Sequence, residues 1–186
     1  PISNLTFISK VIERIVAVQI KAFLEEFDLM PPMQSAYRAG HSTETATLKV
    51  LSDLLDAVDS QETTLLGLLD ISAAFDTVDF EILLQRLEIS YRLNGTVLKW
   101  LTSFVTDRTQ AVVFDGESSS PVKLVCGVPQ GSVLGPLLFV LYAAGVMTIA
   151  LNHGVLIHAY ADDLQTYISC KAVDQNAAIC RIQSCI

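Results

Sequence analysis

Charged residues are scarce in this chain, and one long stretch has none. Only 17% of the 186 residues are charged, and residues 124–161 contain no Asp, Glu, Lys or Arg. Hydrophobic residues make up 51% of the chain, so a globular core is expected and an intrinsically disordered chain is excluded. The length fits one domain or slightly more.

Basic residues are also in short supply. The chain has 12 Lys and Arg against 20 Asp and Glu, which gives a formal net charge of -8, and the basic residues are scattered. A domain that binds nucleic acid by itself usually carries a basic patch or stripe. Any nucleic-acid partner would therefore need basic surface from another part of a larger protein.

The four cysteines lack the spacing of a zinc site. They form no C-x-x-C pair, and His153 and His158 add no zinc-like spacing to them. Residues 1–10 do not resemble a signal peptide. We therefore expect free thiols in an intracellular protein.

Residues 132–151 are mostly apolar and long enough to span a bilayer as a helix. Gly135 and Pro136 near the start, the missing Lys/Arg cluster and the apolar strand expected next all favour a helix buried in a protein core. A membrane-associated protein anchored by residues 132–151 is the alternative.

Apolar periodicity predicts two helices and then a strand in the first 70 residues. Ser42 is a plausible N-cap for the second helix. Residues 64–69 form a continuous apolar run typical of a central strand covered on both faces, with Asp70 at its C-terminal end. The expected inner faces are Ile8, Val11, Ile12, Ile15, Val16, Gln19, Ala22 and Phe23 in the first helix, and Leu48, Leu51, Leu54, Leu55 and Val58 in the second.

The later elements alternate between helices and strands. We expect a helix over residues 78–87, capped by Asp76 or Thr77, and another through residue 105, capped by Asn94 or Thr96. Residues 110–114 and 121–126 predict a hairpin with a polar loop at 115–120, and residues 173–186 predict a last helix. This order indicates the α+β class.

Asp162 and Asp163 follow an apolar run at residues 155–159 and precede residues 164–168 (LQTYI). Neighbouring residues in a strand point to opposite faces, so two acids that act together must lie at a bend. The pattern predicts a β-hairpin with both acids at its tip. Two charges about 4 Å apart repel by roughly 4 kcal/mol at an effective dielectric near 20, so a partly buried pair calls for a bound cation or for protonation. A solvated turn is the alternative.

Four segments occur in the order and spacing of one enzyme family. They are residues 34–43 (QSAYRAGHST), 69–76 (LDISAAFD), 127–136 (GVPQGSVLGP) and 160–163 (YADD). Together they resemble the reverse transcriptases of non-LTR, LINE-type retrotransposons, and the resemblance runs from residues 1–4 to the last helix. Four motifs in order are far more specific than any one of them.

The resemblance implies a right-hand polymerase made of fingers and palm, with an antiparallel palm sheet packed on helices and the thumb absent. The implied division is residues 1–62 for fingers and N-terminal helices, 63–80 for the palm with the first Asp motif, 81–126 for fingers and palm helices with the hairpin, and 127–186 for the rest of the palm. Thumb and endonuclease domains are expected elsewhere in the full-length protein.

The resemblance also implies the site. Asp70 and Asp162, with Asp163 assisting, would hold two Mg²⁺ ions, and Mn²⁺ could substitute for them. The chemistry agrees, because phosphoryl transfer uses paired metals and hard carboxylate ligands favour Mg²⁺ over zinc. The remaining matched positions are Arg38, Phe75, Gln130 and Gly131 for binding a dNTP, and Tyr160 and Ala161 near the primer. Phe75 matches a steric gate against the 2′-hydroxyl; its alternative is an ordinary core Phe.

The implied function is RNA-directed DNA polymerisation, in which dNTPs are added to a DNA primer on an RNA template. An intracellular, nuclear location without membrane association follows from the same resemblance. Two other readings stay open: a catalytically inactive retroelement fragment, and the membrane-associated protein described above.

Overall fold

The computed structural model describes residues 5–185, which form two compact units, each built from two stretches of chain. The first unit contains residues 1–30 and 73–142, and the second contains residues 31–72 and 143–186. Residues 1–4 of the proposed resemblance and residue 186 of the last predicted helix lie outside the described residues. The assignment of residue ranges to fingers and palm stays a prediction.

The second unit is built on a three-stranded antiparallel sheet with the order β1-β7-β6. β1 is Thr63–Asp70, β6 is Leu156–Tyr160 and β7 is Asp163–Cys170. The predicted hairpin with acids at its tip is confirmed, because β6 and β7 pair directly across it. The helices of this unit are α2 (Thr43–Asp59), α6 (Gly145–Asn152) and α7 (Gln175–Cys185), with the 3-10 turn η1 (Ala172–Asp174) before α7.

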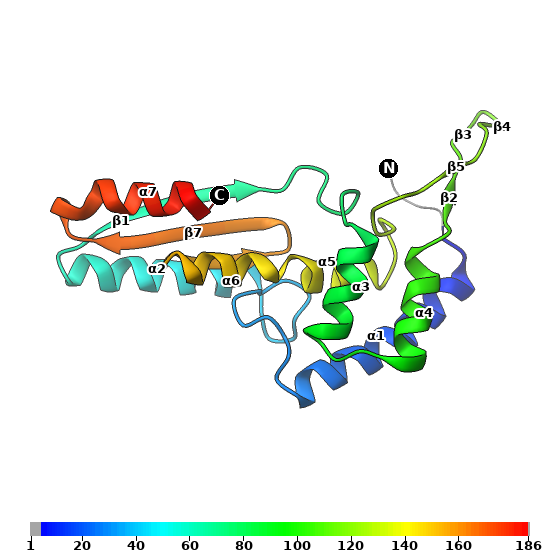
Figure 1. Cartoon of the computed structure of the whole chain (residues 1–186), viewed down its shortest axis with the longest axis horizontal. Coiled ribbons are helices and arrows are strands. Elements are labelled where there is room, and N and C mark those ends of the chain that lie inside the picture. The colour runs from blue at the N-terminus through cyan, green and yellow to red at the C-terminus, as the bar shows by residue number, and fades with distance from the viewer. Residues whose placement is uncertain (1–4, 186) are drawn as a thin grey trace. The chain divides into compact units, whose positions relative to one another are not determined.

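Helices cover both faces of this sheet. Tyr167 of β7 hydrogen-bonds to α2, whereas Leu164 of β7, three residues earlier and so on the opposite face, belongs to a core with Met147 and Ala150 of α6. Ile182 of α7 packs against that core, and Figure 1 shows α7 beside β1 and β7. β7 is therefore the buried centre of this unit.

The expectation that residues 64–69 form a central strand is wrong. β1 is an edge strand of the described sheet, and Leu66 and Leu68 are 47% and 73% exposed. A continuous apolar run predicts a strand that is buried on both faces. In the described sheet β1 instead pairs with β7 along one edge, and the face that carries Leu66 and Leu68 stays partly open to solvent. The predicted place of Asp70 is confirmed, since it is the last residue of β1.

The predicted inner face of α2 is also wrong, although the helix and its N-cap are confirmed. Ser42 accepts a hydrogen bond from Thr45 N–H and completes a capping box. The buried residues are Ala46, Val50 and Ala57. Four residues of the predicted inner face, Leu48, Leu51, Leu55 and Val58, are more than 40% exposed, and the fifth, Leu54, is half-buried.

The first unit contains helices α1 (Phe7–Glu26), α3 (Phe80–Ile89), α4 (Gly95–Val105) and α5 (Gly135–Ala143). The predicted inner face of α1 is wrong, because Ile8, Val11, Ile12 and Ile15 are exposed. The helix instead buries Glu13, Ala17, Ile20 and Leu24. Apolar residues occupy several sides of α1, so periodicity alone could not choose the buried side.

The predicted caps and hairpin of this unit need smaller corrections. Asp79, not Asp76 or Thr77, caps α3 by accepting a hydrogen bond from Ile82 N–H, and Asn94 precedes α4 without a side-chain cap. The predicted hairpin forms as two short ladders, but its loop is shorter than 115–120, because Asp115 and Gly116 alone make a tight turn with positive φ. The strands are β2 (Thr109–Gln110), β3 (Val113–Phe114), β4 (Glu117–Ser118) and β5 (Val122–Lys123).

The long apolar stretch forms α5 and α6 rather than one uniform element. Within the described residues, Gly135–Asn152 is long and apolar enough to cross a membrane, and 44% of it is buried inside the structure. Six of the nine residues of α5 are buried. A helix that is apolar and buried nearly all round suits a protein core, so the packing of α5 favours the predicted core helix.

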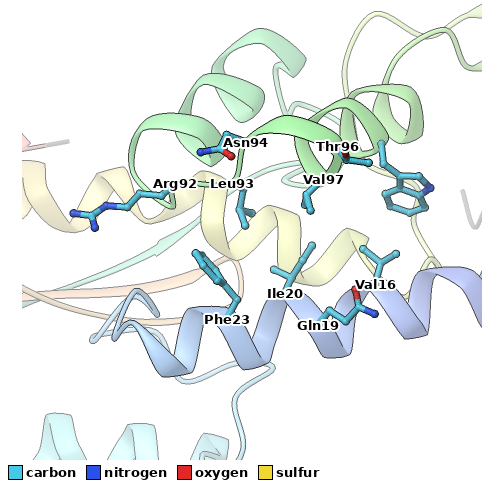
Figure 2. A pocket seen from close by; sticks show the side chains of 10 residues that line it. Val16, Gln19, Ile20, Phe23, Arg92, Leu93, Asn94, Thr96 and Val97 are labelled. Atoms are coloured by element: carbon cyan, nitrogen blue, oxygen red, sulfur yellow. The ribbon is translucent and has the colours of Figure 1, made fainter.

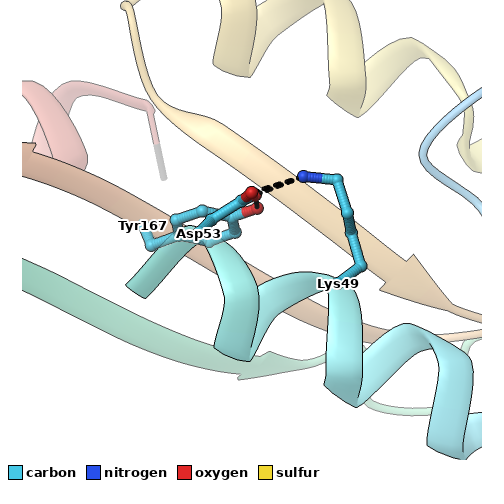
Figure 3. A network of polar contacts seen from close by, with 3 residues as sticks. All are labelled: Lys49, Asp53 and Tyr167. Atoms are coloured by element: carbon cyan, nitrogen blue, oxygen red, sulfur yellow. Dashed lines mark hydrogen bonds and ion pairs between the residues drawn. The ribbon is translucent and has the colours of Figure 1, made fainter. Parts of the chain in front are cut away.

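A polar network joins α2 to the centre of the sheet (Figure 3). The Tyr167 hydroxyl donates to Asp53 Oδ2 over 2.6 Å, and Lys49 Nζ lies 2.5 Å from Asp53 Oδ1. Partial burial acts to raise the pKa of Asp53, but the hydrogen bonds from Lys49 and Tyr167 outweigh it and hold that pKa below its ordinary value. Burial and the neighbouring carboxylate raise the pKa of Tyr167.

We predict that Tyr167→Phe lowers the free energy of unfolding at pH 7 by about 1–2 kcal/mol, since it deletes a hydrogen bond to a charged group. A depressed Asp pKa stabilises the fold above its ordinary value of 3.8, and this stabilisation is lost as pH falls through the folded value. The difference between variant and wild type should therefore shrink as the pH falls below 3.8. Urea denaturation at several pH values measures it, with Lys123→Ala, in an exposed ion pair, as the control with little effect.

Candidate active site

The acidic turn at the tip of the β6–β7 hairpin brings together acids from distant parts of the chain. Tyr160 pairs with Asp163 across the hairpin, which leaves Ala161 and Asp162 as a two-residue loop. On the other side of β7, Asp163 pairs with Asp70 of β1. Directly paired residues point to the same face of a sheet, so Asp70 and Asp163 share a face at one end of the sheet.

The carboxylates of Asp70, Asp162 and Asp163 are accessible. Asp70 and Asp163 are exposed and Asp162 is half-buried. The ion pairs found among residues 5–185 involve other acids. Within the same residues, no three His, Cys, Asp or Glu side chains converge into a group that could hold a metal ion. These carboxylates therefore offer the oxygen ligands that divalent cations prefer. Backbone pairing brings them to one end of the sheet, but they do not surround a single point.

The backbone of the acidic turn is held in an uncommon conformation. Ala161 has φ +56°, and a positive φ at the first loop residue is the sign pattern of a type II′ hairpin turn, where glycine is usual. A residue with a Cβ in this region costs roughly 1–2 kcal/mol. Gln34 offsets that cost: its side-chain Oε1 accepts from Ala161 N–H over 2.9 Å, and its Nε2 donates to Ala161 O over 3.2 Å.

The segment after Gln34 carries two further groups of the site. Burial raises the pKa of the Tyr37 hydroxyl, and the charge of Asp162 raises it further, so Tyr37 lies near the acids. Arg38, predicted to bind a triphosphate, is half-buried, and its guanidinium donates to Pro31 O over 3.4 Å. Arg38, Tyr160, Ala161 and the three acids thus belong to the second unit.

The other predicted nucleotide-binding residues belong to the first unit. The loop that carries Gln130 and Gly131 is joined to the segment of Phe75, because Val128 N–H donates to Phe75 O over 2.8 Å. Gln130 is half-buried, and Gly131 is exposed with φ +88°. Such a backbone conformation favours glycine.

Gly127 makes the close approach of these two segments possible. Its N–H donates to Val78 O over 2.8 Å, and its φ is +89°. A Cβ built on Gly127 would lie 3.0 Å from the Asp76 carbonyl oxygen and 3.1 Å from its Cα. Arg108 adds a hydrogen bond from its guanidinium to Gly127 O. Any larger residue would therefore push the two segments apart.

Phe75 is half-buried and packs on α5. Its ring lies 4.9 Å from that of Phe139, centroid to centroid, at an interplanar angle of 28°. This contact is the packing expected of an ordinary core Phe, which is the alternative to a steric gate. Part of the ring remains accessible. Both roles can belong to one side chain, so the gate stays a prediction.

A buried carboxylate outside the set of predicted site residues anchors the same loop. Glu13 of α1 is 1% exposed, and its Oε2 accepts hydrogen bonds from the N–H groups of Val133 (2.8 Å) and Leu134 (3.1 Å), just before α5 begins. Ser9 Oγ donates to its other oxygen over 3.1 Å. A carboxylate near a helix N-terminus satisfies free N–H groups and interacts favourably with the helix dipole.

A cavity in the first unit is lined by other residues. It has a volume of about 420 Å³ and lies between α1 and the start of α4. Figure 2 shows Val16, Ile20 and Phe23 of α1 on one side and Leu93 and Val97 on the other. None of its lining residues is a predicted site residue, so the site is defined by its acids and loops rather than by this cavity.

A family model described as reverse transcriptase (RNA-dependent DNA polymerase) matches residues 1–184. The chain belongs to this family. It is 39% identical over 166 residues to the probable RNA-directed DNA polymerase from transposon X-element of Drosophila melanogaster, covering 88% of this chain and 18% of that protein. It is 32% identical over 179 residues to the RNA-directed DNA polymerase from mobile element jockey of the same fly, covering 93% of this chain and 19% of that protein.

The predicted membership in the reverse transcriptases of non-LTR elements is thus confirmed. The family consists of nucleotidyltransferases that generally use divalent metal ions. This chain spans about a fifth of the length of the curated relatives it matches. Their whole-protein properties therefore do not transfer to it directly.

Solved structures support the predicted fold. A telomerase from Candida tropicalis in complex with a fragment of telomeric RNA has a TM-score of 0.67 at 12% identity, covering 92% of this chain and 30% of that one. A Candida albicans telomerase in a corresponding complex has a TM-score of 0.64 at 15% identity, covering 95% and 32%. The predicted α+β fold of fingers and palm is confirmed.

We predict that Glu13→Ala lowers the free energy of unfolding by about 3 kcal/mol, because it leaves two N–H groups before α5 without their charged acceptor. Glu13→Gln keeps an acceptor oxygen and should lose less. Denaturant unfolding measures both variants. Glu26→Ala, an exposed acid at the end of the same helix, should change the value by less than about 0.5 kcal/mol; equal losses for Glu13→Ala and Glu26→Ala would contradict the anchoring role.

Proposed function

We propose that this chain is the fingers-palm portion of an RNA-directed DNA polymerase that adds dNTPs to a primer. The single observation that carries the proposal is the pairing of Asp163 with Asp70 on one side and its place next to Asp162 on the other. Carboxylates from distant segments thereby meet at one end of a sheet, in a chain whose family catalyses nucleotidyl transfer. Such gathering is what metal-assisted phosphoryl transfer requires.

Asp70, Asp162 and Asp163 would hold two Mg²⁺ ions, with Mn²⁺ as a substitute. Their exposure and their lack of a described Lys or Arg partner suit hard divalent cations, which prefer carboxylate oxygens. When bound, the metals would activate the primer 3′-hydroxyl and neutralise the leaving pyrophosphate. The protein's own part is to keep the three carboxylates at fixed positions in the sheet and turn.

The remaining site residues would bind and orient the substrates. Arg38 would contact the triphosphate, for which its planar guanidinium is well shaped. Gln130 would lie near the incoming nucleotide, and Gly131 would permit close approach of the backbone. Phe75 would exclude a 2′-hydroxyl, while Tyr160 and Ala161 would support the primer end.

The proposed partners are an RNA template, a DNA primer and dNTPs. With a net charge of -8, this chain supplies little of the attraction that a nucleic-acid backbone normally needs. Thumb and endonuclease domains of the full-length protein would therefore contribute the basic surface. A nuclear location and the absence of membrane association are part of the same proposal.

The central test of this function is Asp162→Ala in the protein that contains the chain. Removing one of the main metal ligands should reduce extension of a primed RNA template by at least about 10³-fold, while template-primer binding stays within a factor of about 3. Gel-based primer extension and filter binding measure the two quantities. Asp59→Ala, an exposed acid at the end of α2, should extend normally, and retained extension by Asp162→Ala would sink the metal-ligand assignment.

A second test concerns sugar selection. Phe75→Ala should raise ribonucleotide incorporation relative to deoxyribonucleotide by about 10-fold or more, since about 1.4 kcal/mol of discrimination corresponds to tenfold. Single-nucleotide extension with matched dNTP and rNTP pairs gives this ratio. Phe139→Leu removes the stacking partner of Phe75 but leaves its ring in place, so it should lower stability without changing the ratio as strongly. An unchanged ratio in Phe75→Ala would remove the gate role.

A further inference from the structure

The side-chain amide of Gln34 pairs with the backbone of the acidic turn as a strand would. Gln34 is 3% exposed, and it both accepts from Ala161 N–H and donates to Ala161 O. Its Oε1 accepts a second hydrogen bond from Ala36 N–H over 2.9 Å. Because N–H groups only donate and carbonyl oxygens only accept, these three contacts determine which way the amide faces.

The segment around Gln34 is itself fixed against β6. Gln34 forms a parallel bridge with Ala159; Ala159 N–H donates to Met33 O over 2.8 Å, and Ser35 N–H donates to Ala159 O over 3.0 Å. A hydrogen bond of 2.8 Å also joins Ser35 Oγ to His158 Nε2. The backbone hydrogen bonds between this segment and β6 are therefore continued by the Gln34 side-chain amide, which bonds to Ala161 in the turn beyond β6.

We propose that Gln34 is a positioning residue for the acidic turn, which holds Ala161 at positive φ and thereby directs the carboxylates of Asp162 and Asp163. This inference rests on the proposed metal-dependent function of the turn. Gln34 exposes too little surface to bind a nucleotide, and its amide oxygen and nitrogen are both hydrogen-bonded to the backbone. Its effect on the reaction is therefore transmitted through the geometry of the two acids that follow Ala161.

The direction of the effect follows from the backbone of Ala161. An alanine released from both hydrogen bonds prefers negative φ, and a change of φ at this position rotates the chain entering Asp162. Metal binding, which needs several oxygens at fixed separations, should suffer more than binding of the nucleotide. Glycine tolerates positive φ without a steric penalty, so Ala161→Gly should make the turn less dependent on Gln34.

The test uses Gln34→Met, which keeps the length of the side chain and removes its hydrogen bonds. Mn²⁺ binding to the purified chain is followed by electron paramagnetic resonance, well below the melting temperature of each variant. Loss of a group that orients metal ligands typically weakens binding by about 10- to 100-fold, and we expect at least about 10-fold here. In primer extension by the protein that contains the chain, kcat should fall while KM for dNTP stays unchanged.

Two further variants separate positioning from folding. Ser35→Ala removes a hydrogen bond of the same segment to β6 without touching the turn, so its Mn²⁺ affinity should match wild type. Gln34→Met combined with Ala161→Gly should recover most of the lost affinity. Equal affinity in wild type and Gln34→Met, even with lower stability, overturns this inference alone; a wild-type chain that binds no Mn²⁺ overturns the proposed metal site and this inference with it.

Discussion

The antiparallel pairing of β7 with strands on both sides is the interaction on which the candidate site depends. Asp163 faces Asp70 of β1 on one side and Tyr160 of β6 on the other. A shift of one residue in either pairing would move every side chain of the shifted strand to the opposite face. Buried residues along β7, including Leu164, Tyr167 and Ile168, make such a shift costly, so the hydrophobic core fixes the place of the acids.

Folding favours separation of the acidic carboxylates, whereas the proposed metal binding requires them to lie close together. Carboxylates about 4 Å apart repel by roughly 4 kcal/mol at an effective dielectric near 20, so an acidic sheet end opposes folding unless cations or solvent screen it. Exposure of Asp70 and Asp163 reduces the penalty, because water surrounds them. The buried half of β7 and the contact of Tyr167 with Asp53 supply stability further along the same strand, where no catalytic geometry is at stake.

The sequence was a good guide to local structure and a poor one to the side that each element buries. The hairpin of Asp162 and Asp163, the cap at Ser42 and the position of Asp70 could be predicted, because each rests on neighbouring residues. The buried sides of α1 and α2 could not, since apolar side chains occur on more than one side of each helix and the true contact surface uses small residues such as Ala17 and Ala46.

The structural roles of Glu13 and Gln34 could not be predicted for a related reason. Each is one polar residue whose importance comes from partners more than a hundred positions away along the chain. The local signals were a charged residue, Glu13, within the first helix, and the place of Gln34 as the first residue of the motif at 34–43. Neither signal names the group that the side chain contacts, so neither role could be predicted from sequence.

Both residues address the same physical problem. A loop that carries functional groups needs a specific backbone conformation, and apolar packing tolerates small shifts because dispersion contacts are individually weak and not directional. A buried hydrogen bond tolerates them poorly, because a misplaced buried polar group loses its partner and pays the cost of desolvation. Gln34 holds Ala161 by two such bonds, and Glu13 holds the start of α5 by two more. The precision of the acidic turn therefore depends on directional contacts from a distant segment, while the hydrophobic core supplies the stability that lets a strained alanine persist there.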